Sequence, residues 1–198
     1  MADQTARTAA DGRTALLVMD VQRRIVDRFS QDPEYLPRLG RAIGAAHAAG
    51  VPVIYVVVGF RAGYPEVGAS NASFSAIAGT GDYTPDDEGA EIHPDVAPRE
   101  GDIVVTKRRV SAFAGSDLDL VLRARDVRKL VLTGIATSGV VLSTLRQAAD
   151  LDYRLAVLAD GCLDADPEVH RVLTEKVYVR QADVLAVDAW VKQVSAAG

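Results

Sequence analysis

The segment Leu130–Asp150, LVLTGIATSGVVLSTLRQAAD, determines the fold that we predict for this chain. It begins as a run of branched apolar residues, breaks at Gly134, passes through the small residues 136–139 and continues with a helical pattern. This order is typical of a buried parallel strand that ends in a tight turn and leads directly into a helix. The amide groups and the positive dipole end of such a helix point towards whatever lies above the strand end. We therefore expect a functional site at this junction.

Further apolar runs alternate with helical patterns on both sides of this segment. The predicted strands cover residues 15–19, 51–58, 102–106, 129–134, 153–160 and 182–187, and the predicted helices cover residues 36–49, 116–126, 138–151 and 166–177. Strands that alternate with helices form an open, mostly parallel sheet covered on both faces. We predict an α/β fold, a single-domain Rossmann-like three-layer sandwich with a six-stranded, mostly parallel sheet.

Three short patterns mark predicted helix ends. Gly50, followed by Pro52, ends the first long helix. Residues 116–119, Ser-Asp-Leu-Asp, resemble a capping box that begins the next helix, with aspartate in place of glutamate. Asp166, followed by Pro167 and an acid in the first turn, is typical of a helix N-cap.

Length and composition favour one globular domain. The chain has 198 residues, of which 48% are hydrophobic, and this is enough for a substantial core. Residues 1–13 lack an apolar run and are predicted to form a flexible tail, and residues 14–198 the domain. No apolar run approaches the roughly 18–20 residues of a membrane span.

Charge and cysteine content restrict the partners and the compartment. The net charge of −5 gives no support for binding to nucleic acid or to an anionic membrane. Cys162 is the only cysteine, so the chain forms no internal disulfide, which favours the reducing cytoplasm.

The segment 59–101 is rich in glycine and proline and shows little periodicity, apart from a possible helical turn at 73–78. Connections of this length in a compact domain are usually functional. We interpret this segment as a lid or a contact between subunits.

Two charged residues stand at the ends of predicted strands. Asp20 follows the first strand and Lys107 the third, while the turn 134–139 follows the fourth. Ligands of open parallel sheets bind outside the carboxyl ends of the strands, so these groups would meet in one crevice if the strands are neighbours. The alternatives are that Asp20 is a helix cap or a structural ion-pair partner and that Lys107 extends into solvent.

Three blocks of sequence resemble the isochorismatase-like family, whose cysteine hydrolases include the nicotinamidases. The blocks are LLVMDVQ (16–22), VVTKRRVSAF (104–113) and LTGIATSGVVLSTLRQAADLDYRLAVLADGC (132–162). The similarity extends from Thr14 to Trp190 in the order of the family. It implies a six-stranded parallel sheet flanked by helices.

The resemblance also implies roles for individual residues. Asp20 matches the family's catalytic aspartate and Lys107 its catalytic lysine. The bond between Ile135 and Ala136 matches a cis peptide, and the amides of Ala136 and Val140 match the donors of an oxyanion hole. Val140 itself takes the position of the family's nucleophilic cysteine, and valine has no nucleophilic atom.

Several functions are compatible with this loss. By resemblance to isochorismatases, Asp20 would act as an acid that protonates the methylene carbon of a vinyl ether, with support from Lys107. Ser138 is a possible substitute nucleophile, although it is better explained as a helix N-cap. Cys162 is another, although a lone cysteine after a strand is usually a buried filler. The chain could also be a pseudoenzyme that binds a small molecule or a partner.

We predict a pocket for a small, carboxylated, planar substrate. An arginine beside aromatic rings suits such a molecule, although Arg61 could instead be a solvated loop residue and Phe113 a core residue. The predicted pocket residues are Gln22, Phe60, Arg61, Phe113, Thr137 and Ser138.

No metal or other cofactor is predicted. His47, His93 and His170 show no metal-ligand spacing, and His47 and His170 are interpreted as surface or packing residues. The resemblance implies a homodimer or homotetramer.

Overall fold

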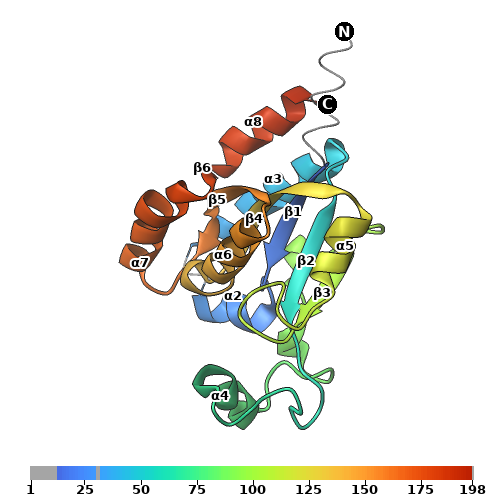
Figure 1. Ribbon diagram of the computed structural model, residues 1–198, viewed down its shortest axis with the longest axis vertical. Coiled ribbons are helices and arrows are strands. Elements are labelled where there is room, and N and C mark those ends of the chain that lie inside the picture. Colours follow the sequence, from blue (N-terminus) through green and yellow to red (C-terminus); the bar gives the residue numbers. More distant parts are fainter. Residues whose placement is uncertain (1–12, 30–31, 198) are drawn as a thin grey trace.

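Within residues 13–29 and 32–197, which the computed structural model describes, six parallel strands form one sheet (Figure 1). The strands are β1 (Arg13–Met19), β2 (Val53–Val58), β3 (Ile103–Lys107), β4 (Val127–Ile135), β5 (Arg154–Leu163) and β6 (Asp183–Leu185). Their spatial order is β3-β2-β1-β4-β5-β6, and each neighbouring pair is parallel. The predicted fold class is confirmed.

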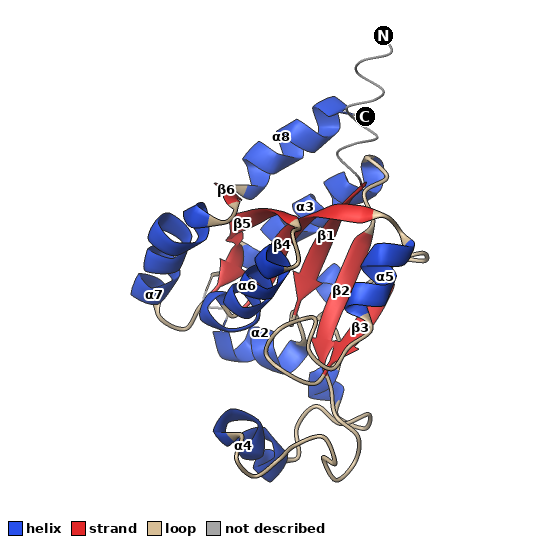
Figure 2. Cartoon of the chain, in the orientation of Figure 1, coloured by secondary structure: helices blue, strands red, loops and turns tan. Residues whose placement is uncertain are grey.

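Helices cover both faces of this sheet, as Figure 2 shows. The longer ones are α2 (Arg23–Phe29), α3 (Tyr35–Ala48), α4 (Ala72–Thr80), α5 (Leu118–Ala124), α6 (Leu142–Asp150), α7 (Pro167–Val172) and α8 (Val187–Ala197). Short helical turns are η1 (Glu88–Ala90), η2 (Pro94–Val96), η3 (Thr137–Val141), η4 (Leu173–Val177) and η5 (Tyr178–Arg180).

The alternation of side chains along β1 creates two cores. Leu16 and Val18 point to one face, where they belong to a buried cluster with residues of α3 and α8. Leu17 and Met19 point to the other face and belong to a cluster with residues of α5 and α6. Because both faces of β1 are covered, its residues 15–19 are all apolar and buried, and the strand occupies the middle of the sheet.

The strand order reverses between β1 and β4. From β1 the chain builds one half of the sheet through β2 and β3, and from β4 it builds the other half through β5 and β6. In open α/β sheets, the carboxyl edge at such a reversal is where ligands bind. Asp20 immediately follows β1 and therefore lies at this point.

Two of the predicted helix ends are confirmed and one is wrong. Gly50 follows α3 with a left-handed φ of 67°, and the Asp166 carboxylate accepts a hydrogen bond from the Glu168 amide at 2.8 Å. The reciprocal capping box is absent: the Ser116 hydroxyl accepts from the Leu118 amide at 3.3 Å rather than from that of Asp119, and it donates to the Ala112 carbonyl at 2.6 Å. Asp119 instead pairs with Arg123 one helical turn further on, at 2.9 Å.

The segment 59–101 contains more structure than its sequence predicts. It includes α4, which the Asn71 side chain caps by accepting a hydrogen bond from the Phe74 amide. Phe74 packs with Phe60 and Val58 in a small separate cluster. Figure 1 shows α4 and its flanking loops extending beyond the end of the sheet where β2 and β3 terminate.

The predicted tail falls largely outside the described residues. Its last residue, Arg13, is already the first residue of β1 and pairs with Val127, so the strand begins earlier than predicted. No helix in the described part of the chain is both long and apolar enough to span a membrane.

Candidate active site

Asp20 is a buried carboxylic acid at the carboxyl end of β1. Its backbone has a left-handed φ of 57°, a conformation that aspartate tolerates better than most residues. Its amide donates to the Val56 carbonyl at 2.7 Å, which fixes the strand end against β2. The residue retains only 6% of its exposure.

Lys107 reaches Asp20 from the far strand of this half-sheet. It ends β3, and the Lys107 Nζ lies 2.9 Å from the Asp20 Oδ2, although β2 separates the two strands. The side chains are 3% and 9% exposed, respectively. The structure therefore brings together the two charges that the sequence places at strand ends.

The environment of Asp20 favours its protonated form. Burial raises the pKa of Asp20, and the neighbouring Lys107 ammonium opposes this effect without cancelling it. The Oδ1 atom of Asp20 is buried and has no hydrogen-bond partner among the described residues. One oxygen is thus fixed by the ammonium, while the other is available to exchange a proton or a hydrogen bond with a ligand.

The turn after β4 lies directly beside this pair because Gly134 allows a very close approach. Gly134 pairs with Met19 in the sheet and has a φ of 134°. A Cβ atom at this position would lie 2.1 Å from the Met19 carbonyl oxygen, so only glycine fits. The next peptide bond, between Ile135 and Ala136, is cis, at the position where the family resemblance implies one.

The prediction that Ser138 is a helix N-cap is wrong. Its amide instead donates to the Asp164 carboxylate at 2.7 Å. Thr137 is fully buried, and Val140 is 2% exposed and packs in the core that faces α5 and α6. The carboxylate of Asp164, which lies outside the turn, therefore accepts the hydrogen bond in place of the Ser138 hydroxyl.

Residues after β5 hold the turn in place, a role that we did not predict from the sequence. The Thr137 hydroxyl lies 2.8 Å from the Nδ1 atom of His170 in α7, and the Tyr178 hydroxyl donates to the Thr137 carbonyl at 2.6 Å. Burial lowers the pKa of His170, which favours a neutral ring. The only available signal was that α7 follows β5 and therefore starts at the same edge of the sheet.

The predicted pocket residues have different environments. Gln22 is fully buried and bridges the Val58 backbone and the Ala90 carbonyl, so it joins β2 to the segment 59–101. Phe60 packs with Phe74. Phe113 lies in the main core, where its ring centroid is 6.0 Å from that of Tyr153.

Arg61 is an exposed member of the predicted pocket residues. Its side chain is 69% exposed and pairs with Glu66 at 2.5 Å. Tyr83, which we did not predict as a pocket residue, lies in the same segment 59–101 and is partly buried. Burial raises the pKa of Tyr83 to about 12, and the charges of Asp82 and Asp20 act in the same direction.

Cys162 has the properties of a core residue. It is 2% exposed in the main cluster, and burial raises the pKa of its thiol to about 12. A thiol in this state is protonated at neutral pH and is a poor nucleophile.

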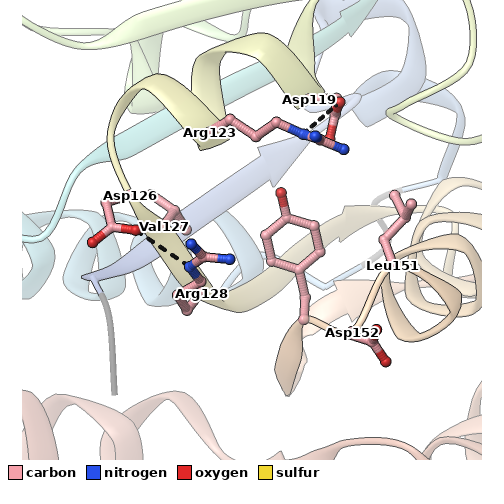
Figure 3. Close-up of a pocket in the computed structure, with 8 residues that line it drawn as sticks. Asp119, Arg123, Asp126, Val127, Arg128, Leu151 and Asp152 are labelled. Atoms are coloured by element: carbon pink, nitrogen blue, oxygen red, sulfur yellow. Dashed lines mark hydrogen bonds and ion pairs between the residues drawn. The ribbon is translucent and has the colours of Figure 1, made fainter. Parts of the chain in front are cut away.

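The described surface also carries hollows away from Asp20. One of about 480 Å³ lies between α2 and η1. Another, of about 440 Å³, lies at the amino edge of the sheet between the start of β4 and the start of β5, and Figure 3 shows the side chains that line it. Its lining residues are Asp119, Arg123, Asp126, Val127, Arg128, Leu151, Asp152 and Tyr153. Its charged side chains pair with each other, as in Arg123–Asp119 and Arg128–Asp126. We place the candidate site at Asp20, because there a buried acid retains an unused oxygen.

No group of three or more histidine, cysteine, aspartate or glutamate side chains in the described ranges is arranged to hold a metal ion. His47 pairs with Asp102 at 2.8 Å near the start of β3, and His93 caps η2. Each of these histidines therefore has a local structural partner.

Comparison with known proteins identifies the family. The sequence matches the isochorismatase domain over residues 14–189. It is 38% identical over 184 residues to the ureidoacrylate amidohydrolase RutB of Stutzerimonas stutzeri, over 78% of this chain and 71% of that enzyme. It is 34% identical to the uncharacterized isochorismatase family protein YecD of Escherichia coli O157:H7, over 88% of this chain and 93% of that protein.

Solved structures agree. A cysteine hydrolase from Pseudomonas syringae pv. phaseolicola superposes with a TM-score of 0.86 over 94% of each chain and, at 23% identity, shows the fold. The N-carbamoylsarcosine amidase of Thermoplasma acidophilum superposes with a TM-score of 0.73 at 27% identity, over 89% of this chain and 97% of that chain. Together with the domain match, these similarities show that the chain belongs to the isochorismatase-like hydrolase family.

Proposed function

We propose that this protein hydrolyses a small, carboxylated molecule, with Asp20 as the general acid and Lys107 as its partner, and without a cysteine nucleophile. The observation that carries this proposal is the state of Asp20. The acid is buried, its pKa is raised by burial, and one of its two oxygens has no partner among the described residues. A carboxyl group whose pKa is raised keeps its proton to a higher pH than an ordinary aspartate, which suits a general acid.

The proposed reaction is the hydrolysis of a vinyl ether. Asp20 transfers its proton to the terminal methylene carbon of the substrate, and the double-bond electrons form the new C–H bond. Water then adds to the resulting oxocarbenium carbon and loses a proton, which restores the acid. The hemiketal finally expels the alcohol and leaves a keto acid. The Lys107 ammonium stabilises the Asp20 carboxylate formed in the first step.

The proposal needs no protein nucleophile, in agreement with the chemistry of the neighbouring residues. Val140 is an apolar core residue, and Cys162 is buried with a raised pKa. The Thr137 hydroxyl is fully buried and is engaged by His170. Water is therefore the attacking group in this scheme.

A second candidate is the hydrolysis of an amide or ureido bond. It is favoured by the names of the relatives, which include a ureidoacrylate amidohydrolase and, among solved structures, an N-carbamoylsarcosine amidase. In that reaction Asp20 would act as the base that activates water. Asp20 would then have to be ionised at the start of the reaction, whereas its burial favours the protonated form.

The experiment offers the purified protein two carboxylated substrates, isochorismate as the vinyl ether and ureidoacrylate as the ureido acid. Products are identified by mass spectrometry, and binding is followed by thermal shift. Release of a keto acid supports the first candidate, and release of ammonia supports the second. A thermal shift without any product would indicate the alternative, a pseudoenzyme that only binds.

The cytoplasmic location and the homodimeric or homotetrameric assembly belong to the same proposal. Light scattering of the purified protein measures the assembly directly. A monomer would contradict this part of the proposal without affecting the chemistry.

A further inference from the structure

The Lys107 ammonium has a second partner besides Asp20. Its Nζ donates to the backbone carbonyl of Arg109 at 3.0 Å. A lysine side chain has four rotatable bonds, and its ammonium stays in one place only when several acceptors surround it. The position of the Arg109 carbonyl therefore helps to decide where the ammonium lies relative to Asp20.

The side chain of Arg109 connects this carbonyl to the segment 59–101. One guanidinium nitrogen donates to the Arg108 carbonyl at 2.6 Å, and another donates to the Glu66 carbonyl at 2.7 Å. The guanidinium also lies over the Phe74 ring of α4, 5.8 Å from its centroid. Arg109 thus contacts Lys107 through its backbone carbonyl, and through its side chain it contacts Glu66 and Phe74. We call the helix α4 together with the loop that carries Glu66 the α4 region.

The neighbouring Arg108 contacts the same loop in a different way. Its Nε lies 3.3 Å from the Oε1 of Glu66, the oxygen that also pairs with Arg61. Arg108 therefore binds the carboxylate of Glu66, whereas Arg109 binds its backbone. The carbonyl that accepts from the Lys107 ammonium belongs to Arg109 alone.

We propose that Arg109 is a positioning residue that couples the α4 region to the Asp20–Lys107 pair. Its side-chain contacts with Glu66 and Phe74 fix its peptide group, and the fixed carbonyl keeps the Lys107 ammonium beside Asp20. Displacement of the α4 region would release this carbonyl and loosen the ammonium. The inference rests on the proposed function only in assigning a catalytic use to the pair.

The test compares Arg109→Gln with Arg108→Gln. Both variants remove one positive charge from adjacent residues that contact Glu66, and the Asp20 pKa shift is attributed to Lys107 and burial rather than to either arginine charge. The titration of the Asp20 carboxyl carbon is followed by carbon-13 NMR in the absence of substrate. Lys107 lowers the pKa of Asp20, so a loosened ammonium raises the titration midpoint. We expect Arg109→Gln to raise it by about one unit more than Arg108→Gln.

A second readout follows the α4 region itself. Hydrogen exchange of the α4 amides should be faster in Arg109→Gln than in wild type. Arg109→Lys keeps the charge but lacks the planar fork that reaches two carbonyls, so we expect a midpoint between those of wild type and Arg109→Gln. This conservative variant also serves as the test if Arg109→Gln does not fold.

Equal midpoints in Arg109→Gln and Arg108→Gln would overturn the proposal, even if exchange in α4 changes, because Arg109 would then only anchor the segment. The outcome is separable from the proposed function. If wild type hydrolyses neither substrate but the midpoints differ as expected, the coupling stands and the proposed reaction fails.

Discussion

Two ion pairs at opposite edges of the sheet differ in how far they are exposed to solvent. At the amino edge, a hollow of about 440 Å³ is lined by ion pairs such as Arg123–Asp119, whose side chains are 70% and 40% exposed. At the carboxyl edge, Asp20 and Lys107 are both buried. Exposed pairs contribute about 0–1 kcal/mol to stability and accumulate on any surface. Buried pairs carry a large desolvation cost and are rare without a function.

The size of a hollow is therefore a weaker indicator of a site than the burial and pairing of the charged groups around it. Asp119 also has a buried oxygen without a partner in the described ranges, but the rest of its side chain is solvated and pairs with Arg123. Asp20 is largely buried and is connected to β2, β3 and, through Lys107, to Arg109. Substitutions at the candidate site can therefore be tested against matched substitutions elsewhere in the chain.

The largest effect is expected for Asp20→Asn compared with Asp119→Asn. Asparagine cannot deliver the proton, so turnover should fall about 100- to 10,000-fold, as for the loss of a general acid. At a pH above the folded pKa of Asp20, the variant also removes the carboxylate that pairs with the buried Lys107 ammonium, which should lower the free energy of unfolding by about 3 kcal/mol. Steady-state kinetics and urea denaturation measure the two effects. Equal turnover of the two variants would place the chemistry elsewhere.

Gly134→Ala should be the most disruptive change of backbone shape. Its Cβ would overlap the Met19 carbonyl, so β4 would have to move away from β1, at an expected loss of several kcal/mol of stability. Gly40→Ala in α3 is the control, because among the described residues nothing lies within 4 Å of its added Cβ. The control should gain up to about 1 kcal/mol from helix propensity. Thermal denaturation of both variants checks this contrast, and a stable Gly134→Ala would refute the close approach.

The titration of Asp20 predicts how stability depends on pH. Because the folded pKa of Asp20 is raised above its ordinary value of 3.8, the folded state binds this proton more tightly than the unfolded state. Its contribution to stability is therefore greatest below pH 3.8 and is lost as the pH rises to the folded pKa. Lys107→Met removes the cation that lowers this pKa, so the loss should continue to higher pH, with a slope of at most about 1.4 kcal/mol per pH unit.

Urea denaturation of wild type and Lys107→Met at a series of pH values measures this slope. Asp20→Asn is the control, because it removes the titrating group and with it this component of the pH dependence. If the window of pH dependence in Lys107→Met lies at lower pH than in wild type, the ammonium does not oppose the effect of burial.

A smaller effect on stability, but an informative one on reactivity, is expected for Val140→Cys. The thiol is slightly smaller than the valine side chain, so we expect a loss of about 1 kcal/mol. If residue 140 faces the Asp20–Lys107 pair, as the family resemblance implies, the Lys107 ammonium favours the thiolate form of the new cysteine. Alkylation by iodoacetamide should then be faster than in the control Val141→Cys and faster than at Cys162, which is buried. Equal labelling at 140 and 141 would show that residue 140 does not face the site.

Much of the fold could be predicted from the sequence because its signals are local. Apolar runs that end at a charge or a glycine mark the buried strands, and each of the six predicted strands overlaps an observed one. Since carboxyl ends of parallel strands meet at one edge, the positions of Asp20 and Lys107 could also be predicted, and their 2.9 Å contact agrees with this.

The parts that failed depend on partners distant in sequence. Ser138 reads locally as a helix cap, but Asp164, on the connection after β5, takes that role. The contact of His170 with Thr137 likewise requires α7 to fold back over the turn. Arg109 resembles any surface arginine until the loop that carries Glu66 is placed beside it. No pattern within one element encodes these contacts.

If Asp20 is the acid of the reaction, the pH at which its carboxyl group titrates should match the pH at which activity is lost. The Asp20 carboxyl is titrated by carbon-13 NMR in wild type, and the midpoint is compared with the pH at which kcat/KM falls on the alkaline side. We predict a midpoint above 3.8 that coincides with this alkaline limb, because only the protonated acid starts the reaction. A midpoint at or below 3.8, or an alkaline limb that does not follow it, would contradict the account.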